Sequence, residues 1–113
     1  MADYHEKWDA LPPEVRDDHR AVKSLQEELE AVDWYDQRMA LTDDEDLRRI
    51  LEHNRNEEME HAAMLMEWLR RRSDTWDAEL RTYLFTDAPI VEVEENDPAG
   101  GTSLGIGKPK GGE

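Results

Sequence analysis

The sequence predicts an all-α protein: a two-helix antiparallel hairpin, half of a four-helix bundle that dimerisation completes, followed by a short C-terminal helix and a flexible tail. Three observations support this fold class. Segments 14–40 and 45–72 contain no Gly or Pro and repeat apolar residues at steps of three and four. A short polar break separates them, which suits a tight connection between antiparallel helices. All Gly residues lie beyond residue 97, where no core element is expected.

The N-terminal part of the chain divides into an arm and a helix. Residues 1–12 show no periodicity and are expected to form a flexible arm ahead of a helical domain over 13–97. Pro12 and Pro13 suit the first turn of a helix that runs to about Ala40. The inward stripe of this helix contains Ala21, Leu25, Val32, Tyr35 and Met39.

A second long helix and shorter elements follow. Thr42, with Glu45 three residues later, has the form of a capping box, so we expect a helix from there to about Arg72. Its seam contains Leu47, Leu51, Asn54, Glu58, His61, Leu65 and Trp68. Segment 75–85 is expected to be helical, and 86–97 to form one more short helix or an extended arm. Residues 98–113 read as a flexible tail.

The composition excludes several classes of function. The 113 residues carry 29 acidic and 14 basic side chains, a formal net charge of -15, which argues against nucleic acid as a partner. The absence of cysteine excludes disulfides and thiolate metal sites. No apolar run approaches the ~20 residues that span a bilayer, and no signal-peptide core is present. We therefore expect a cytoplasmic protein with no membrane partner.

The hairpin is expected to pack against a second copy of itself. Two helices of roughly 27–30 residues each enclose too little interior to be stable alone. Each helix also carries apolar residues outside its inward stripe, such as Val22 and Leu29 on the first and Ile50 and Leu69 on the second. These extra apolar rows need a partner surface.

Three polar residues interrupt the apolar seams. Glu58 and His61 are three residues apart on one face of the second helix, between Leu51 and Leu65. Glu28 interrupts the stripe of the first helix in the same way. An unpaired buried carboxylate is costly, but two carboxylates and an imidazole become favourable around a divalent cation. Oxygen and nitrogen ligands of this kind suit iron, manganese or zinc.

The alternative interpretation is a buried ion pair between Glu28 and His61 that fixes helix register, a role that Asn54 also suits. A carboxylate-bridged di-metal site in a four-helix bundle needs a Glu from each of two helices and a Glu-x-x-His from each of the other two. This chain supplies half of that set, with Glu28 on one helix and Glu58 and His61 on the other. Two copies about a two-fold axis would complete it.

Other polar and aromatic residues are weaker candidates. Three residues on the outer face of the second helix are expected to be solvated: His53, Glu57 and Glu60. Glu27 and Glu30 could form a weak outer cation site or could simply be solvated. Trp34 and Tyr35 suit packing roles, although Tyr35 lies two turns from Glu28 on the same stripe.

Four segments closely resemble the encapsulated ferritins: "EELEAVDWYDQR" (27–38), "HNRNEEMEHAAM" (53–64), "EWLRR" (67–71) and "LRTYLFT" (80–86). The resemblance runs from about residue 19 to 107. It implies a ferritin-like two-helix protein whose ferroxidase centre forms only at a dimer interface. It also implies assembly as a ring-shaped homodecamer of five dimers that encloses no storage cavity of its own.

The resemblance also implies roles for individual residues. By motif, Glu28, Glu58 and His61 would be the catalytic residues and metal ligands of a di-iron centre, with Tyr35 close to it. A secondary metal site, or a site where iron enters, would involve Glu27, Glu30 and Trp34. Calcium or zinc could take the place of iron in a structure.

The tail contains "TSLGIG" (102–107), which resembles the encapsulin-targeting peptide, with Leu104, Gly105, Ile106 and Gly107 as its last four residues. This resemblance implies an encapsulin shell as partner and a location inside that nanocompartment. Without the resemblance, a Gly-rich arm with two apolar anchors still fits a peptide that docks on a partner. The alternative is an inert disordered terminus.

The expected function is a ferroxidase that oxidises Fe(II) to Fe(III) with O₂ and supplies iron for mineral storage inside the shell. Two alternatives use the same ligands. One is a rubrerythrin-like di-metal oxidase or peroxidase, disfavoured because no Cys₄ element is present. The other is a structural oligomer bridged by a metal such as zinc or calcium.

Overall fold

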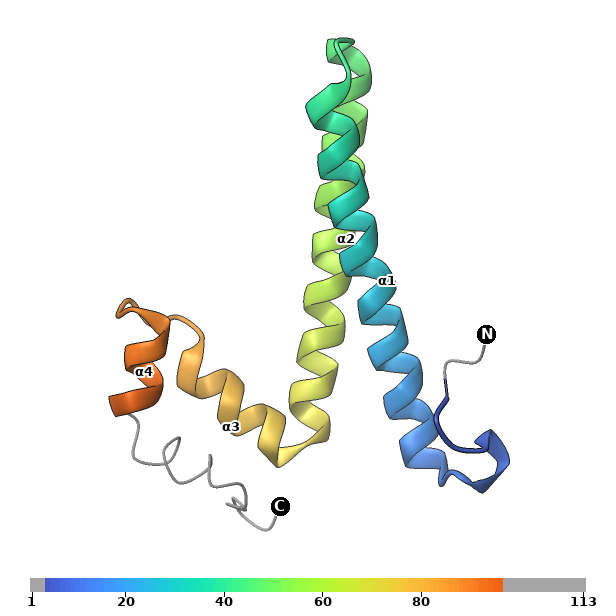
Figure 1. Ribbon diagram of the computed structural model, residues 1–113, viewed down its shortest axis with the longest axis vertical. Coiled ribbons are helices and arrows are strands. Elements are labelled where there is room, and N and C mark those ends of the chain that lie inside the picture. The colour runs from blue at the N-terminus through green and yellow to red at the C-terminus, as the bar shows by residue number, and fades with distance from the viewer. Residues whose placement is uncertain (1–3, 97–113) are drawn as a thin grey trace. The chain divides into compact units, whose positions relative to one another are not determined.

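The computed structural model describes residues 4–96, and this part of the chain is all helical with no strand (Figure 1). In chain order the elements are η1 (Trp8–Ala10), α1 (Pro13–Leu41), α2 (Glu45–Arg72), α3 (Asp74–Tyr83) and α4 (Ile90–Asn96). The predicted all-α fold with two long helices is confirmed. The chain divides into two compact units, 1–66 and 67–113, which are described separately.

Helix α1 forms where the sequence offers a good start and no breaker. Pro13 occupies the first helical position, where its missing N–H costs nothing. The helix ends where the N–H of Thr42 donates to the carbonyl of Arg38 at 3.1 Å. Ala21 is buried, and the rest of its stripe is half-buried: Leu25, Glu28, Val32, Tyr35 and Met39. Glu28 therefore occupies an inward position between apolar residues, as its spacing predicts.

The start of α2 differs from the predicted capping box, which was wrong. The N–H of Leu47 donates to Oδ1 of Asp44 at 2.9 Å, so Asp44 caps the helix. Oγ1 of Thr42 instead accepts from the N–H of Asp44 at 3.2 Å. The segment "TDDED" offers several capping side chains in succession, and the one next to Glu45 takes the role.

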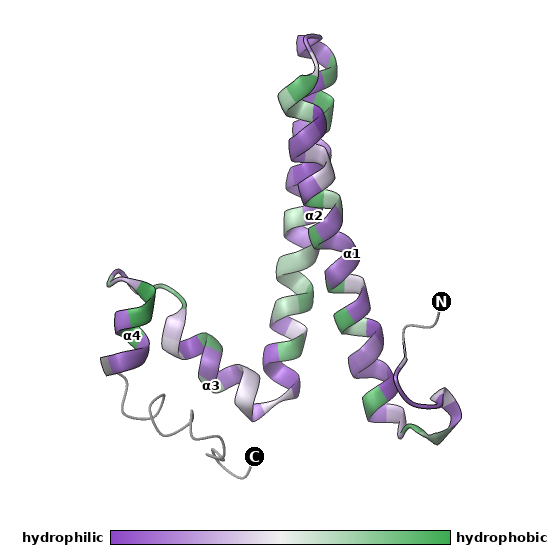
Figure 2. Cartoon of the chain, in the orientation of Figure 1, coloured by the Kyte–Doolittle hydropathy of each residue, from purple (hydrophilic) through white to green (hydrophobic). Residues whose placement is uncertain are grey.

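In unit 1–66, α1 and α2 run antiparallel from their connecting loop (Figure 1). An ion pair between Nη1 of Arg55 and Oδ1 of Asp36 at 2.8 Å links them. Figure 2 shows hydrophobic residues interspersed with hydrophilic ones along both helices. Among the described residues only Ala21, Ala62 and Leu69 are buried. Residues 4–96 of a single chain therefore enclose almost no core.

The N-terminal arm contacts the first turns of α1. Nε of Arg16 donates to the carbonyl of Trp8 at 3.1 Å, and its guanidinium lies 5.1 Å from the Trp8 ring centroid. The ring centroid of Tyr4 is 4.9 Å from that of Trp8 and 4.5 Å from that of His19. These contacts hold the described part of the arm against α1.

In unit 67–113, a hydrogen-bonded cap and a charge network define α3. Oγ of Ser73 accepts from the N–H groups of Thr75 and Trp76, both at 3.2 Å. Arg70 pairs with Glu67 on its own helix at 2.7 Å and also with Asp77 of α3. Helix α4 packs against α3. The short helix was one of two forms predicted for 86–97.

The predicted targeting motif in the tail lies outside the residues that the structure describes. None of the helices within residues 4–96 combines the length and the apolar composition that crossing a membrane requires.

Candidate metal centre

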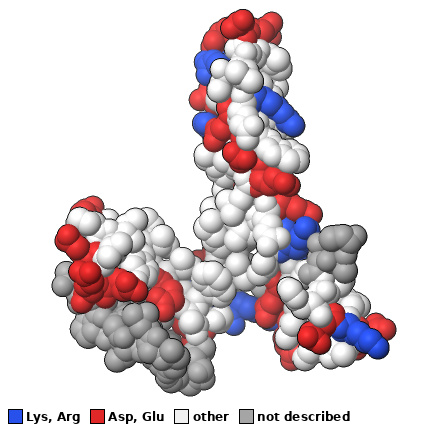
Figure 3. Space-filling model, viewed as in Figure 1, with Lys and Arg blue, Asp and Glu red and all other residues white. Residues whose placement is uncertain are grey.

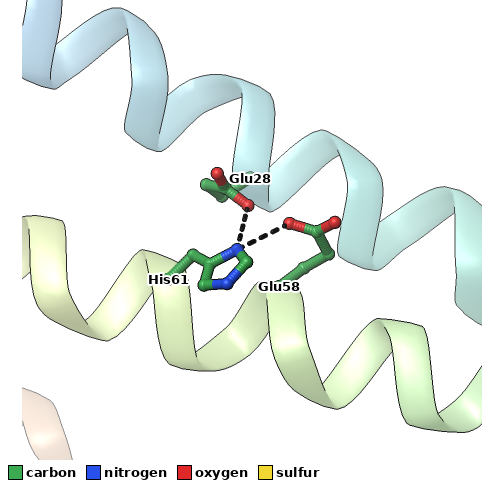
Figure 4. Close-up of side chains that lie close together, drawn as sticks. All are labelled: Glu28, Glu58 and His61. Atoms are coloured by element: carbon green, nitrogen blue, oxygen red, sulfur yellow. Dashed lines mark hydrogen bonds and ion pairs between the residues drawn. The ribbon is translucent and has the colours of Figure 1, made fainter.

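Three side chains from the two long helices converge inside the hairpin (Figure 4). Glu28 extends from α1, and Glu58 and His61 extend from α2. Nδ1 of His61 lies 3.3 Å from Oε1 of Glu58 and 3.5 Å from Oε1 of Glu28. One atom from each side chain falls within 4.8 Å of the other two. We refer to these three residues as the triad.

Helix geometry brings the triad together. Glu58 and His61 are three residues apart, so their side chains leave α2 from one face about one turn apart. Glu28 meets them because it lies on the half-buried stripe of the antiparallel α1. The side chains of Glu28 and Glu58 are 24% and 25% exposed, whereas that of His61 is 41% exposed. The two carboxylates are therefore more shielded from solvent than the imidazole is.

The triad shifts the proton affinities of its members. A hydrogen bond with Glu58, burial and the charge of Glu58 raise the pKa of Glu28 above its ordinary value of 4.5, and His61 offsets this only in part. Burial opposes a charge on His61, but the hydrogen bond with Glu58 and the charges of both carboxylates outweigh it. The pKa of His61 is therefore raised above 6.5. The centre favours added positive charge.

The oxygen chemistry fits a cation. While Glu28 and Glu58 are both ionised, the buried Oε1 of Glu28 has no hydrogen-bond donor, because His61 at 3.5 Å is too distant to donate well. An unsatisfied buried carboxylate oxygen is costly, and a divalent ion would satisfy it. Two ligand atoms that each lie about 2.1 Å from one ion are at most about 4 Å apart. The three atoms of the triad already lie within 4.8 Å of one another, so small side-chain rotations would bring them to this separation. Two oxygens and one imidazole nitrogen suit iron, manganese or zinc.

The other predicted site residues do not join the triad within one chain. Glu27 and Glu30 are exposed on α1, and Trp34 is 48% exposed. Tyr35 is half-buried, and the guanidinium of Arg38 lies 5.4 Å from its ring centroid. Within residues 4–96, no second group of three or more acidic or imidazole side chains converges on one point.

One neighbour of the triad was not predicted to contact it. His53, Glu57 and Glu60 are exposed, as a solvated face requires. Yet Oε1 of Glu57 lies 4.0 Å from Nε2 of His61, on the side of the ring away from the two carboxylates. The sequence did contain a signal, because Glu57 precedes His61 by four residues and the two are neighbours on a helix surface.

Comparisons with known proteins cover this part of the chain. A family model described as EncFtn-like matches residues 3–87. The "Ferritin-like protein" of Thermotoga maritima is 59% identical over 113 residues, covering 96% of this chain and 99% of that protein. The "Encapsulated ferritin-like protein" of Rhodospirillum rubrum is 54% identical over 101 residues, covering 89% of this chain and 72% of that protein. The crystal structure of protein ne0167 from Nitrosomonas europaea is 55% identical with a TM-score of 0.77, covering 79% of this chain and 98% of that one.

Proposed function

Because this chain belongs to the EncFtn-like family, we propose that it is a ferroxidase whose di-iron centre forms between two subunits. Membership makes it a ferritin-like protein with an iron-related role. The proposal adds the reaction: Fe(II) and O₂ are the substrates, and Fe(III) leaves for mineral storage inside an encapsulin nanocompartment in the cytoplasm. The shell protein enters this proposal because a relative is named an encapsulated ferritin-like protein.

The observation that carries the proposal is the triad itself. Glu28, Glu58 and His61 place two oxygens and a nitrogen around one point, and the buried Oε1 of Glu28 has no hydrogen-bond partner. The alternative, an ion pair between Glu28 and His61, leaves that oxygen without a good partner at 3.5 Å. A cation would satisfy all three groups together.

A second copy of the chain supplies the other half of a di-metal centre. A carboxylate-bridged pair of metals in a four-helix bundle takes two single Glu ligands and two Glu-x-x-His pairs, and one hairpin carries one of each. The hairpin also leaves large apolar side chains uncovered: Val22 (40% exposed), Leu29 (48%), Ile50 (53%), Met59 (46%) and Met64 (57%). A two-fold dimer would cover such rows, and a ring-shaped decamer of five dimers is the proposed assembly.

The residues of the triad have distinct tasks in this proposal. Ionised Glu28 and Glu58 would offset the charge of the bound iron and favour its higher oxidation state, while neutral His61 would bind the iron through the lone pair of Nδ1. A pair of Fe(II) ions would supply two electrons, and O₂ would accept them together with two protons from solvent to give hydrogen peroxide. Acidic side chains spread over the hairpin and over α4 on the face drawn in Figure 3, and this negative surface would concentrate cations near the protein.

Further residues enter the proposal in supporting roles. Exposed Glu27 and Glu30, with Trp34 beside them, would form a secondary metal site or the place where iron enters. Tyr35 would lie close to the di-iron centre. The motif Leu104–Gly107 in the tail would bind the shell. Calcium or zinc could occupy the triad in place of iron without being oxidised.

Aerobic addition of Fe(II) tests this proposed function. The intact protein should produce ferric absorbance faster than buffer does. Glu58→Ala and His61→Ala should each reduce the rate by more than about 10-fold, because each removes a ligand from both halves of a symmetric centre. Glu52→Ala is the matched control, since Glu52 lies on α2 outside the triad and pairs with Arg48 at 3.7 Å.

Two results would contradict the proposal. Full ferroxidase activity in both triad variants would place the chemistry elsewhere. Binding of Fe(II) by the intact protein with no oxidation above the buffer rate would favour a structural metal.

A further inference from the structure

The two nitrogens of the His61 ring face different groups. Nδ1 points at the carboxylates of Glu28 and Glu58, and Figure 4 shows the second nitrogen on the side of the ring away from them. On that side, Oε1 of Glu57 lies 4.0 Å from Nε2. The imidazole therefore lies between the two carboxylates of the triad and a third carboxylate outside it.

Glu57 is held in this position by its own helix. It precedes His61 by four residues, the spacing and order that favour contact between an acidic and a basic side chain on a helix. Its other oxygen, Oε2, lies 3.9 Å from Nε2 of His53, four residues earlier still. The side chain of Glu57 is 51% exposed and lies between two imidazoles on one face of α2.

A cation bound by the triad fixes which nitrogen of His61 carries the proton. Nδ1 would use its lone pair to bind the ion, so the neutral ring must carry its hydrogen on Nε2. That N–H then faces Oε1 of Glu57. The present separation of 4.0 Å exceeds a hydrogen bond by about 1 Å, and rotation of the half-exposed Glu57 side chain can close it.

We propose that Glu57 is a positioning residue of the metal centre, which accepts the Nε2–H of His61 and thereby orients Nδ1 toward the metal. The inference rests on the proposed metal-binding function of the triad. A carboxylate acceptor on the far side of an imidazole ligand fixes its tautomer and orientation and increases its basicity. Loss of such a partner costs about 10- to 100-fold in metal affinity or activity.

Glu57 was expected to be part of a solvated face, and the two interpretations give different results on substitution. If Glu57 is only a solvated charge, Glu57→Gln and Glu57→Ala lose the same charge and have equal effects. If it is a hydrogen-bond acceptor, Gln retains an oxygen that can accept from Nε2, whereas Ala does not. Glu60→Gln removes the same charge from the same face three residues along the helix, and it serves as the control.

The test uses Co(II), which binds such ligands without being oxidised by O₂ on the timescale of a titration. Affinity is measured by competition with a chelator for the full chain and the variants. Glu57→Ala should weaken Co(II) binding by about 10- to 100-fold. Glu57→Gln should recover part of this loss, and Glu60→Gln should bind like the unaltered chain.

A second readout separates positioning from a general structural effect. In the Co(II)-loaded protein, the exchangeable Nε2–H of His61 gives a proton resonance shifted outside the normal range. We expect this resonance in the unaltered chain and in Glu57→Gln, and its loss through fast solvent exchange in Glu57→Ala. Thermal unfolding and oligomer mass are recorded for every variant, so that a misfolded protein is recognised as such.

The possible failures are distinguishable. Co(II) affinity and Nε2–H exchange that do not change in Glu57→Ala would overturn the role of Glu57. Equal losses in Glu57→Ala and Glu57→Gln would also overturn it, because only the charge would then matter. Co(II) affinity that does not change in His61→Ala would instead contradict metal binding by the triad, and with it the proposed function.

Discussion

Glu28 and His61 both have raised pKa values, and both must be deprotonated to bind a cation. A raised pKa means that protons compete with the metal up to a higher pH than for the free side chains. Metal affinity should therefore fall as pH is lowered. The first loss should come when pH falls through the pKa of His61, which lies above 6.5, and the second when pH falls through the pKa of Glu28, which lies above 4.5. Chelator competition with Co(II) between about pH 8 and 5 measures this dependence.

His61→Ala provides the control for this pH dependence. This substitution should weaken metal binding at high pH. It should also remove the part of the pH dependence nearest neutrality, because the side chain that is protonated first as pH falls is absent. Affinity that stays constant from about pH 8 to 5.5 would contradict the assignment of His61 as a ligand.

At the same scale, the convergence of the three triad residues could be predicted from the sequence, whereas the contact of Glu57 with the triad was not predicted. Glu28, Glu58 and His61 each break an apolar stripe at helical spacing, so their inward direction follows from periodicity alone. Metal binding by them stays a prediction. Periodicity places Glu57 on the outer helix face and His61 on the inner one, so their contact was missed. The imidazole of His61 has nitrogens on two sides of its ring, and Nε2 can therefore approach a residue on the outer face.

At the scale of elements, both long helices could be predicted because they contain no Gly or Pro and carry a regular stripe. Boundaries depend on the choice among neighbouring capping side chains, which is why Asp44 was missed in favour of Thr42. Phe85 adopts a φ of 61° and is fully exposed in the turn after α3. No sequence signal indicated this, because the left-handed region is unusual for a residue with a bulky side chain.

The link between α2 and α3 gives a prediction for an element. Arg70 bridges Glu67 and Asp77, and Asp77 also accepts from Nε of Arg81 at 2.8 Å. Arg70→Met should keep the apolar stem and remove the bridge, so amide hydrogen exchange over Asp74–Tyr83 should accelerate. Exchange in α1 should not change. Arg49→Met, an exposed substitution on the same helix, is the control.

The same network has a defined pH range. Hydrogen bonds from Arg70 and Arg71 lower the pKa of Glu67 from 4.5 to about 2. A lowered carboxyl pKa stabilises the folded state above the ordinary value, and this contribution is lost as pH falls from about 4.5 through about 2. The effect of Arg70→Met on exchange should therefore be present at neutral pH and should shrink as pH falls from about 4.5 towards about 2. An equal effect at all pH values would contradict the role of the ion pairs.

At the scale of the whole molecule, the tail should act separately from the helices. Deleting residues 98–113 should leave folding, oligomer mass and iron oxidation unchanged, because no helix stripe includes them. It should abolish loading into a co-expressed encapsulin shell, measured as cargo per purified shell. Many weakly bound tails on one oligomer bind effectively, so loss of the peptide has a large effect.

A double substitution provides the sharper form of this prediction. Leu104→Asp with Ile106→Asp should abolish loading as the deletion does. Each substitution would place a charge in the apolar groove of the shell protein that the tail is proposed to bind. The control replaces Gly111 and Gly112, which lie outside the motif, with Ala, and it should leave loading intact. Equal loading of the intact and truncated chains would show that the tail is inert.

The central claim is that two chains build one di-iron centre. This proposal rests on a hairpin with three converging side chains that could bind a metal, a buried carboxylate oxygen without a hydrogen-bond partner, and almost no core. The most direct test is a crystal structure of the Fe(II)-soaked protein with anomalous data at the iron edge. We expect two iron peaks about a two-fold axis, ligated by Glu28, Glu58 and His61 of both subunits. Iron held by the residues of a single chain, or no iron at the triad, would contradict this account.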